Sequence, residues 1–146
     1  MDGVQIGYDT KTNSALFDGD FIIGSVLGSS EFFNGYIDEV RISRSNVFSS
    51  TPNVGNTDTL TVPTGKSVED ANTKLLLHMD MLDESGDGGS GIYHPVQFVE
   101  EAQLNIVEKK FGSTSVVFDG SADYLIIPHH SEFDFGVGDF TIVYRS

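Results

Sequence analysis

Apolar and polar residues alternate with a period of two in several short segments of this chain. The clearest case is residues 36–42, where the sequence is YIDEVRI. A period of two is typical of a β-strand, because successive side chains point to opposite faces. The pattern predicts two faces for this strand, namely Tyr36, Asp38, Val40 and Ile42 against Ile37, Glu39 and Arg41. Further strands are expected in residues 74–79, 115–119, 124–127 and 139–145.

The residue types also favour strands and turns over helices. Alanine, the best helix former, occurs four times, whereas there are 16 glycines and 11 phenylalanines. Asp18-Gly19 lies between apolar residues and is a dipeptide of the kind that closes tight hairpins. Hydrophobic residues make up 38% of the chain, and its 146 residues are enough for one core. A folded all-β domain is therefore expected rather than a disordered chain.

The composition changes between residues 45 and 73. This stretch is rich in Ser, Thr, Asn and Gly, contains Pro52 and Pro63, and has few large apolar residues. Such a composition is typical of a linker, or of a strap laid over a sheet. The sequence therefore predicts three parts, which are strands in residues 1–44, a linker in residues 45–73 and strands in residues 74–146.

The charge of the chain limits the classes of partner. There are 22 acidic and 8 basic residues, which give a formal net charge of -14. Such a field repels phosphate, so we expect no nucleic acid or anionic membrane as partner, whereas cations are favoured. No apolar run approaches the ~18 residues of a membrane-spanning helix, so no membrane insertion is expected. The first residues do not resemble a signal peptide, and the lack of cysteine excludes a disulfide framework.

Several motifs resemble those of one known family. Residues 33–43, FNGYIDEVRIS, look like the closing strand of laminin-G-like domains of the concanavalin A-like lectin/glucanase superfamily. Residues 2–3 (DG) and 22–24 (IIG) precede this strand in the family's order. The later part of the chain is similar to the opening of such a domain, with matching runs at residues 75–80, 111–112, 117–120, 123–125 and 139–142. The resemblance implies an all-β, jelly-roll β-sandwich.

The order of these motifs is unusual, because the family's closing strands come first and its opening strands come last. The chain is expected to be either a fragment, joining the end of one laminin-G-like unit to the start of the next, or a circular permutant. We favour the fragment, because Met1 resembles an internal residue and Ser146 falls within a predicted strand. A fragment would expose strand edges and self-associate. In a permutant, the strands of residues 2–44 would pair with those of residues 74–145 inside one molecule.

The resemblance leaves a catalytic glucanase open, but the acidic residues do not favour one. A retaining glycosidase needs two carboxyl groups about 5–5.5 Å apart, which strand residues two positions apart can supply. Asp38 and Glu39 are adjacent and are expected to point to opposite faces. We therefore expect a non-catalytic module that binds a glycan or a cell-surface protein, within a larger extracellular or virion-surface protein. A purely structural assembly module is the alternative, and a glucanase fragment comes third.

Calcium is the cofactor that the sequence suggests. Residues 83–88, DESGDG, match the first half of a calcium loop, in which Asp83, Ser85 and Asp87 would turn oxygens inward. Asp38 shares a predicted face with apolar residues and would need a partner if it were buried. The resemblance also implies a structural calcium ion near the terminal strands, and hence at Asp38. The alternative, which we favour, is a solvated acidic loop and an Asp38 capped by backbone amides.

Two further features carry weaker signals. His129-His130 follows a proline and offers two metal ligands, although a solvated turn is the expected structure. The five tyrosines and 11 phenylalanines provide rings of the kind that hold sugars, but most of these rings are expected to lie in the core. Neither feature assigns a ligand-binding residue.

Overall fold

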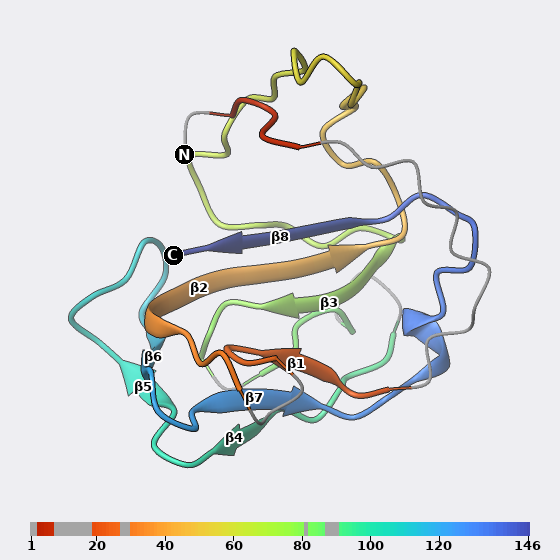
Figure 1. The fold of residues 1–146 in the computed structure, drawn as a ribbon. Coiled ribbons are helices and arrows are strands. Elements are labelled where there is room, and N and C mark those ends of the chain that lie inside the picture. Colours follow the sequence, from red (N-terminus) through yellow and green to blue (C-terminus); the bar gives the residue numbers. More distant parts are fainter. Residues whose placement is uncertain (1–2, 8–18, 27–29, 81, 87–90) are drawn as a thin grey trace.

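The structure, a computed structural model, describes residues 3–7, 19–26, 30–80, 82–86 and 91–146. Within these ranges the chain forms short strands and one 3-10 turn, with no α-helix (Figure 1). The strands are β1 (Phe21–Ile23), β2 (Asn34–Ser43), β3 (Thr73–Leu77), β4 (Gln97–Val99), β5 (Gln103–Asn105), β6 (Ser115–Asp119), β7 (Tyr124–Ile127) and β8 (Thr141–Arg145). The 3-10 turn is η1 (Ser131–Phe133). No helix in the described part of the chain has the length and apolarity that crossing a membrane requires.

The strands form two antiparallel sheets. The smaller sheet has the order β1-β7-β4, and the larger has the order β3-β2-β6-β5, with β8 also paired to β2. One hydrophobic cluster contains side chains from both sheets. The chain is therefore all-β, as the sequence predicts, with a β-sandwich-like arrangement of two sheets. The jelly-roll connectivity stays a prediction.

Strands from the two ends of the chain are interleaved in both sheets. β1 pairs with β7 in the smaller sheet. β2 pairs with β3, with β6 and with β8 in the larger sheet. The strands within residues 21–43 thus share both sheets with the strands within residues 73–145, and the choice between a fragment and a permutant stays a prediction.

β2 is the long strand around which the larger sheet is built, and it contains a bulge. Its register against β8 shifts between Asp38 and Arg41, and Glu39 has a φ of 57°. A bulge adds one residue and bends the strand, so the alternation of faces changes phase there. Ile37 consequently joins Val40 in the hydrophobic core. The predicted strand is confirmed, but its strict two-faced pattern is wrong at Ile37.

Residues 63–70 lie against the larger sheet as a strap, whereas residues 53–60 hydrogen-bond to residues 3–5 instead. The backbone amide of Ser67 donates a hydrogen bond of 2.7 Å to Glu39 Oε2. The Arg41 guanidinium forms an ion pair of 2.8 Å with Asp70. Arg145 of β8 donates a hydrogen bond to the Pro63 carbonyl. The polar composition of this stretch therefore provides partners for charged side chains of the sheet.

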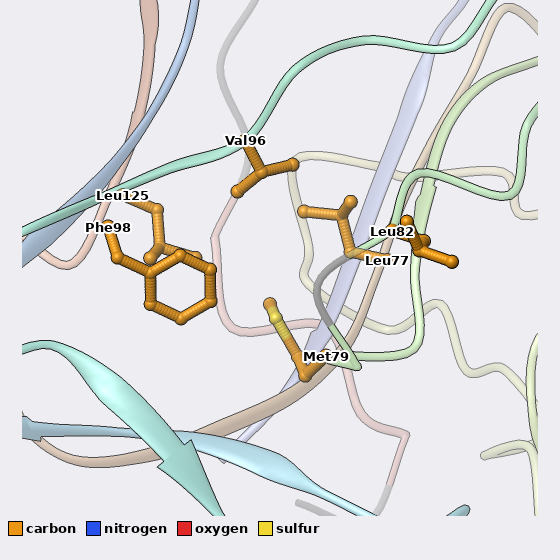
Figure 2. Close-up of a pocket in the computed structure, with 6 residues that line it drawn as sticks. All are labelled: Leu77, Met79, Leu82, Val96, Phe98 and Leu125. Atoms are coloured by element: carbon orange, nitrogen blue, oxygen red, sulfur yellow. The ribbon is translucent and has the colours of Figure 1, made fainter.

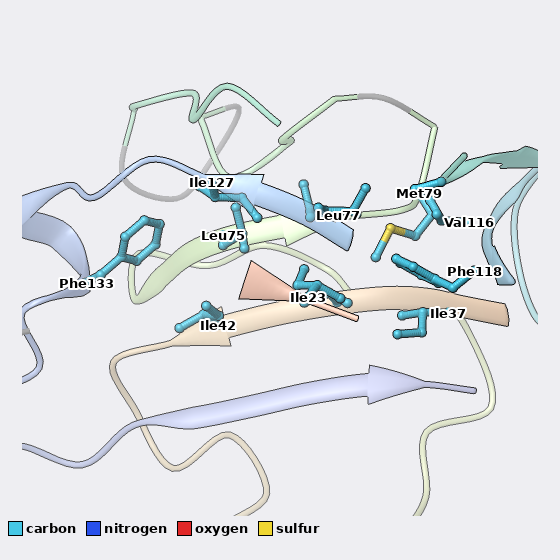
Figure 3. Close-up of a cluster of buried hydrophobic side chains, with 13 residues drawn as sticks. Ile23, Ile37, Ile42, Leu75, Leu77, Met79, Val116, Phe118, Ile127 and Phe133 are labelled. Atoms are coloured by element: carbon cyan, nitrogen blue, oxygen red, sulfur yellow. The ribbon is translucent and has the colours of Figure 1, made fainter. Parts of the chain in front are cut away.

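The core lies between the two sheets, as Figure 3 shows for the cluster of buried side chains. Phe118 and Phe133 are the largest of the fully buried residues. The ring of Phe33 packs edge-on against Phe118, with 6.0 Å between ring centroids. Gly24 has a φ of +96° and lies against the same ring, where an added Cβ would come within 2.6 Å of a ring atom. The close packing of β1 on β6 thus requires glycine at this position.

Candidate functional site

Asp83 is the centre of a buried hydrogen-bond network in the loop that follows β3. Its Oδ1 accepts hydrogen bonds from the backbone amides of Leu76 and Ser85. Its Oδ2 accepts from the Ser85 hydroxyl, from the His94 amide and from the His94 ring at Nδ1, the last over 2.7 Å. Five donors therefore converge on one carboxylate, which ties the loop to the neighbouring strand and to His94.

The charge of Asp83 is stabilised by these donors. Burial on its own raises the pKa of Asp83, because a buried carboxylate loses its hydration. The hydrogen bond from His94 and those from the amides of Leu76, Ser85 and His94 outweigh burial, so the pKa lies below its usual range. Asp83 is consequently ionised at neutral pH.

The two ring nitrogens of His94 have different surroundings, since Nδ1 is hydrogen-bonded to Asp83 and Nε2 faces Glu132. The His94 side chain is 2% exposed and packs on the Phe133 ring, with 4.7 Å between centroids. Because His94 Nδ1–H donates to Asp83, the lone pair of the imidazole lies on Nε2. This buried Nε2 has no hydrogen-bond partner among the described residues. It lies 3.6 Å from Glu132 Oε2.

The turn η1 brings Glu132 and His130 to the same place. His130 is the N-cap of η1, and its Nδ1 accepts a hydrogen bond from the Glu132 amide. The His130 ring lies edge-on to His94, with centroids 5.2 Å apart. Glu132 Oε1 is 3.2 Å from Lys74 Nζ, while the buried Oε2 has no hydrogen-bond partner in the described part of the chain. His94, His130 and Glu132 place one potential ligand atom each within 4.8 Å of one another.

A second buried pair joins β2 to the end of β3. Glu39 is 1% exposed, and its Oε1 lies 2.7 Å from His78 Nδ1. The other ring nitrogen of His78 is 3.4 Å from Glu84 Oε2. Since Glu39 Oε2 also accepts the Ser67 amide, both carboxylate oxygens are engaged. This pair is a structural connection between the sheet, the strap and the loop after β3.

The residues that the sequence suggests for calcium do not form one cluster in the described part of the chain. Asp38 is buried, and its Oδ2 accepts the amides of Lys110 and Phe111, whereas its buried Oδ1 has no hydrogen-bond partner among the described residues. Asp83 and Ser85 lie together, but each Asp83 oxygen already accepts protein donors. Asp87 lies outside the described residues. Among the described residues, the group of three His, Asp or Glu side chains close enough to hold an ion is the one around His94.

An apolar groove of about 320 Å³ opens between β1 and β8. Apolar side chains of β1, β2 and β8 line it, together with Phe33, and its polar side-chain groups are those of Ser25 and Glu31 and the Tyr144 hydroxyl. Ile142 and Tyr144 of β8 face this groove and remain 44% and 53% exposed. Figure 1 explains this exposure, because β8 lies at the edge of the larger sheet that the smaller sheet does not cover.

Figure 2 shows a second, much smaller cavity, which lies beside the loop after β3 and is lined by residues of β3, β4, β7 and this loop. Its volume is about 10 Å³, and its lining is entirely apolar. A space of this size holds about one water-sized sphere and offers no polar group to fix a ligand. It is a packing defect rather than a binding site. The lining residues are Leu77, Met79, Leu82, Val96, Phe98 and Leu125.

No protein-family model matches this chain, and comparisons with curated proteins and with solved structures find no match. The groove and the buried network are therefore the features of this chain that indicate a function.

The sequence indicates His130 as a possible metal ligand, but it does not indicate the partners His94 and Glu132. His94 carries no metal signal of its own in the sequence, because no second ligand stands beside it. Glu132 follows the histidine pair in the sequence, two residues after His130. An HHSE run signals a ligand pair on its own, but its meeting with His94 depends on tertiary contacts between η1 and the loop.

Proposed function

We propose that this chain is a non-catalytic binding module of a larger extracellular or virion-surface protein, and that the groove between β1 and β8 receives its partner. The groove is the observation that carries this proposal. Soluble domains rarely leave neighbouring aromatic and aliphatic side chains exposed unless they meet a partner. Phe140, Ile142 and Tyr144 are exposed along one face of β8 and of the residue before it.

The chemistry of the groove favours a protein segment over a glycan. A glycan needs several hydrogen-bonding groups beside an aromatic face, whereas the polar side-chain groups here are few, namely those of Ser25 and Glu31 and the Tyr144 hydroxyl. β1 is the outer strand of the smaller sheet and, among the described residues, pairs only with β7. An extended segment paired to the other edge of β1 would lie over Ile142 and Tyr144. Addition of a strand to a free sheet edge is a common mode of peptide recognition.

The buried carboxylates support a non-catalytic role. The oxygens of Asp83 and Glu39 accept hydrogen bonds from neighbouring backbone and side-chain groups. Asp38 is held by two backbone amides. Acids that hold the fold together in this way are poorly placed to flank a glycosidic bond. The resemblance to laminin-G-like domains agrees with a binding module, and glycan binding is the second candidate because Tyr144 and Phe33 offer ring faces in the groove.

The test uses peptides and glycans as separate probes. A phage library of random linear peptides is selected on the whole chain, and the same preparation is applied to a glycan array. We expect selected peptides with alternating apolar residues that bind the wild-type protein and lose at least tenfold in affinity against Tyr144→Asp. The control is Val107→Asp, which adds the same charge at an exposed apolar residue that does not line the groove.

Hydrogen exchange then tests the mode of binding. A bound peptide should slow the exchange of backbone amides in β1, because an added strand protects them. Peptides that bind Tyr144→Asp as tightly as wild type would contradict the proposed site. Selective glycan binding that Tyr144→Asp abolishes, without any selected peptide, would favour the glycan candidate instead.

A further inference from the structure

We propose that His94, His130 and Glu132 form a binding site for a divalent transition-metal ion, with zinc as the ion that these donors fit best. The site joins the loop after β3 to the turn η1. It lies apart from the groove between β1 and β8, and the proposal does not depend on the function assigned to that groove.

Two of the three donor atoms are buried and unsatisfied by the protein. His94 Nε2 and Glu132 Oε2 have no hydrogen-bond partner among the described residues, and they lie 3.6 Å apart. This separation is too long for a good hydrogen bond. It is close to the roughly 3.3 Å expected between two ligands that bind zinc tetrahedrally at about 2.0–2.1 Å. Leaving both atoms without a partner costs free energy, which a bound cation would offset.

His94 and Glu132 are each held in orientation by a neighbouring side chain. Asp83 Oδ2 accepts a hydrogen bond of 2.7 Å from His94 Nδ1–H, which leaves the Nε2 lone pair for the ion. Lys74 contacts Glu132 Oε1 at 3.2 Å, which leaves Oε2 turned toward His94. A carboxylate behind a ligating histidine is a recurrent feature of zinc sites, since it fixes the ring and raises its basicity. Asp83, for which the sequence suggested calcium, is thus placed to support a different metal.

The donor set determines the class of metal. Calcium and magnesium take oxygen ligands, and two imidazole nitrogens exclude them as the fitting ion. Two histidines and one glutamate match a zinc site with three protein ligands and a fourth position for water or another small ligand. His130 completes the set from the solvent side, because its side chain is 38% exposed whereas that of His94 is 2% exposed. This difference gives an ion a route of entry.

Zinc and cobalt titrations of the metal-free whole chain test the site. We expect about one equivalent of Zn²⁺ by calorimetry, a rise in melting temperature, and visible Co²⁺ bands of tetrahedral intensity. His130→Asn and Glu132→Gln should each weaken zinc binding at least tenfold and abolish the cobalt bands. Asn supplies an oxygen that can replace His130 Nδ1 as the acceptor of the Glu132 amide and cap η1, so His130→Asn is expected to fold. The control is His129→Asn, which alters the neighbouring histidine and should bind like wild type.

The competing interpretation is an ion pair, in which a protonated His94 faces Glu132 and no metal binds. Wild-type protein that takes up no zinc and gives no cobalt bands would overturn the proposed metal site and favour the ion pair. Equal zinc affinity in wild type, His130→Asn and Glu132→Gln would overturn the proposed site as well, because binding would then reside elsewhere on this acidic chain. Calcium that raises the melting temperature as much as zinc would contradict the assigned donor set.

Discussion

Replacing Asp83 with asparagine should destabilise the fold strongly, although it hardly changes the volume of the side chain. The carboxylate accepts hydrogen bonds from three backbone amides, one hydroxyl and one imidazole. An amide group has only one acceptor oxygen, so its NH₂ must face at least two of these donors. Breaking a buried charged arrangement by altering one partner typically costs about 3–5 kcal/mol.

The size of the expected effect follows from the number of donors left without an acceptor. Each buried donor that loses its acceptor costs about 1–3 kcal/mol, and Asp83→Asn leaves at least two. For a chain of this length, about 3–5 kcal/mol corresponds to a fall in melting temperature of roughly 6–20 °C. Ser85→Ala removes one hydroxyl donor and leaves the carboxylate intact, so it should cost only about 1 kcal/mol.

Urea unfolding followed by circular dichroism, in the presence of a chelator, measures this difference without a contribution from metal. Asp139→Asn is the control, because it removes one negative charge at an exposed position of a chain whose net charge is -14. We expect that variant to be as stable as wild type or slightly more stable. A loss below about 1 kcal/mol in Asp83→Asn would refute the view that Asp83 organises the loop.

Three further variants test the core, the backbone and the strap by thermal and urea unfolding. Phe118→Ala should lose about 3–5 kcal/mol, because it empties a fully buried ring position, and a loss under 1 kcal/mol would contradict the described core. Gly24→Ala should lose about 1–3 kcal/mol, since its φ is positive and its Cβ would meet the Phe118 ring; unchanged stability would contradict that contact. Burial raises the pKa of Asp70, but hydrogen bonds from the Asn72 amide and the Arg41 guanidinium lower it below its usual value. The stabilisation from Asp70 is therefore present above about pH 4 and lost as the pH falls through its folded-state pKa, so Asp70→Asn should flatten the acid side of the stability profile, and an unchanged profile would argue against the ion pair.

The strands were predictable because their sequences carry a local signal. Alternation in residues 115–119 and 124–127 matches the observed bounds of β6 and β7. In β2 the alternation was also present, but the bulge at Glu39 depends on how the strand bends between β6 and β8. No local pattern reports that bend, so the predicted face of Ile37 was wrong.

The candidate metal cluster was not predictable as a unit, because its members come from distant parts of the chain. Glu132 and His130 are neighbours in sequence, but His94 reaches them only through the packing of its ring on Phe133. The DESGDG run suggested calcium since its spacing places oxygens on one side of a loop. In the structure, the Asp83 oxygens are turned toward backbone amides and a histidine, which sequence spacing alone does not reveal.

Cross-linking tests most directly whether the two ends of the chain build one sandwich within a single molecule. Tyr36 of β2 and Val117 of β6 are paired residues on neighbouring antiparallel strands. Their Cα atoms should lie about 4.5–5.5 Å apart, within the range that a disulfide spans. The native chain has no cysteine, so a Tyr36→Cys/Val117→Cys double variant contains no other thiol.

Mild oxidation followed by non-reducing electrophoresis and mass spectrometry gives the decisive result. We predict a monomer with one internal disulfide, stabilised by up to about 4 kcal/mol because the bond closes a loop of roughly 80 residues. A Tyr36→Cys/Val137→Cys variant should stay reduced, since Val137 precedes β8, whose first residue pairs with the far end of β2. Disulfide-linked dimers of the Tyr36/Val117 variant would mean that the strands pair between molecules, as a self-associating fragment would. That result would contradict the single interleaved sandwich.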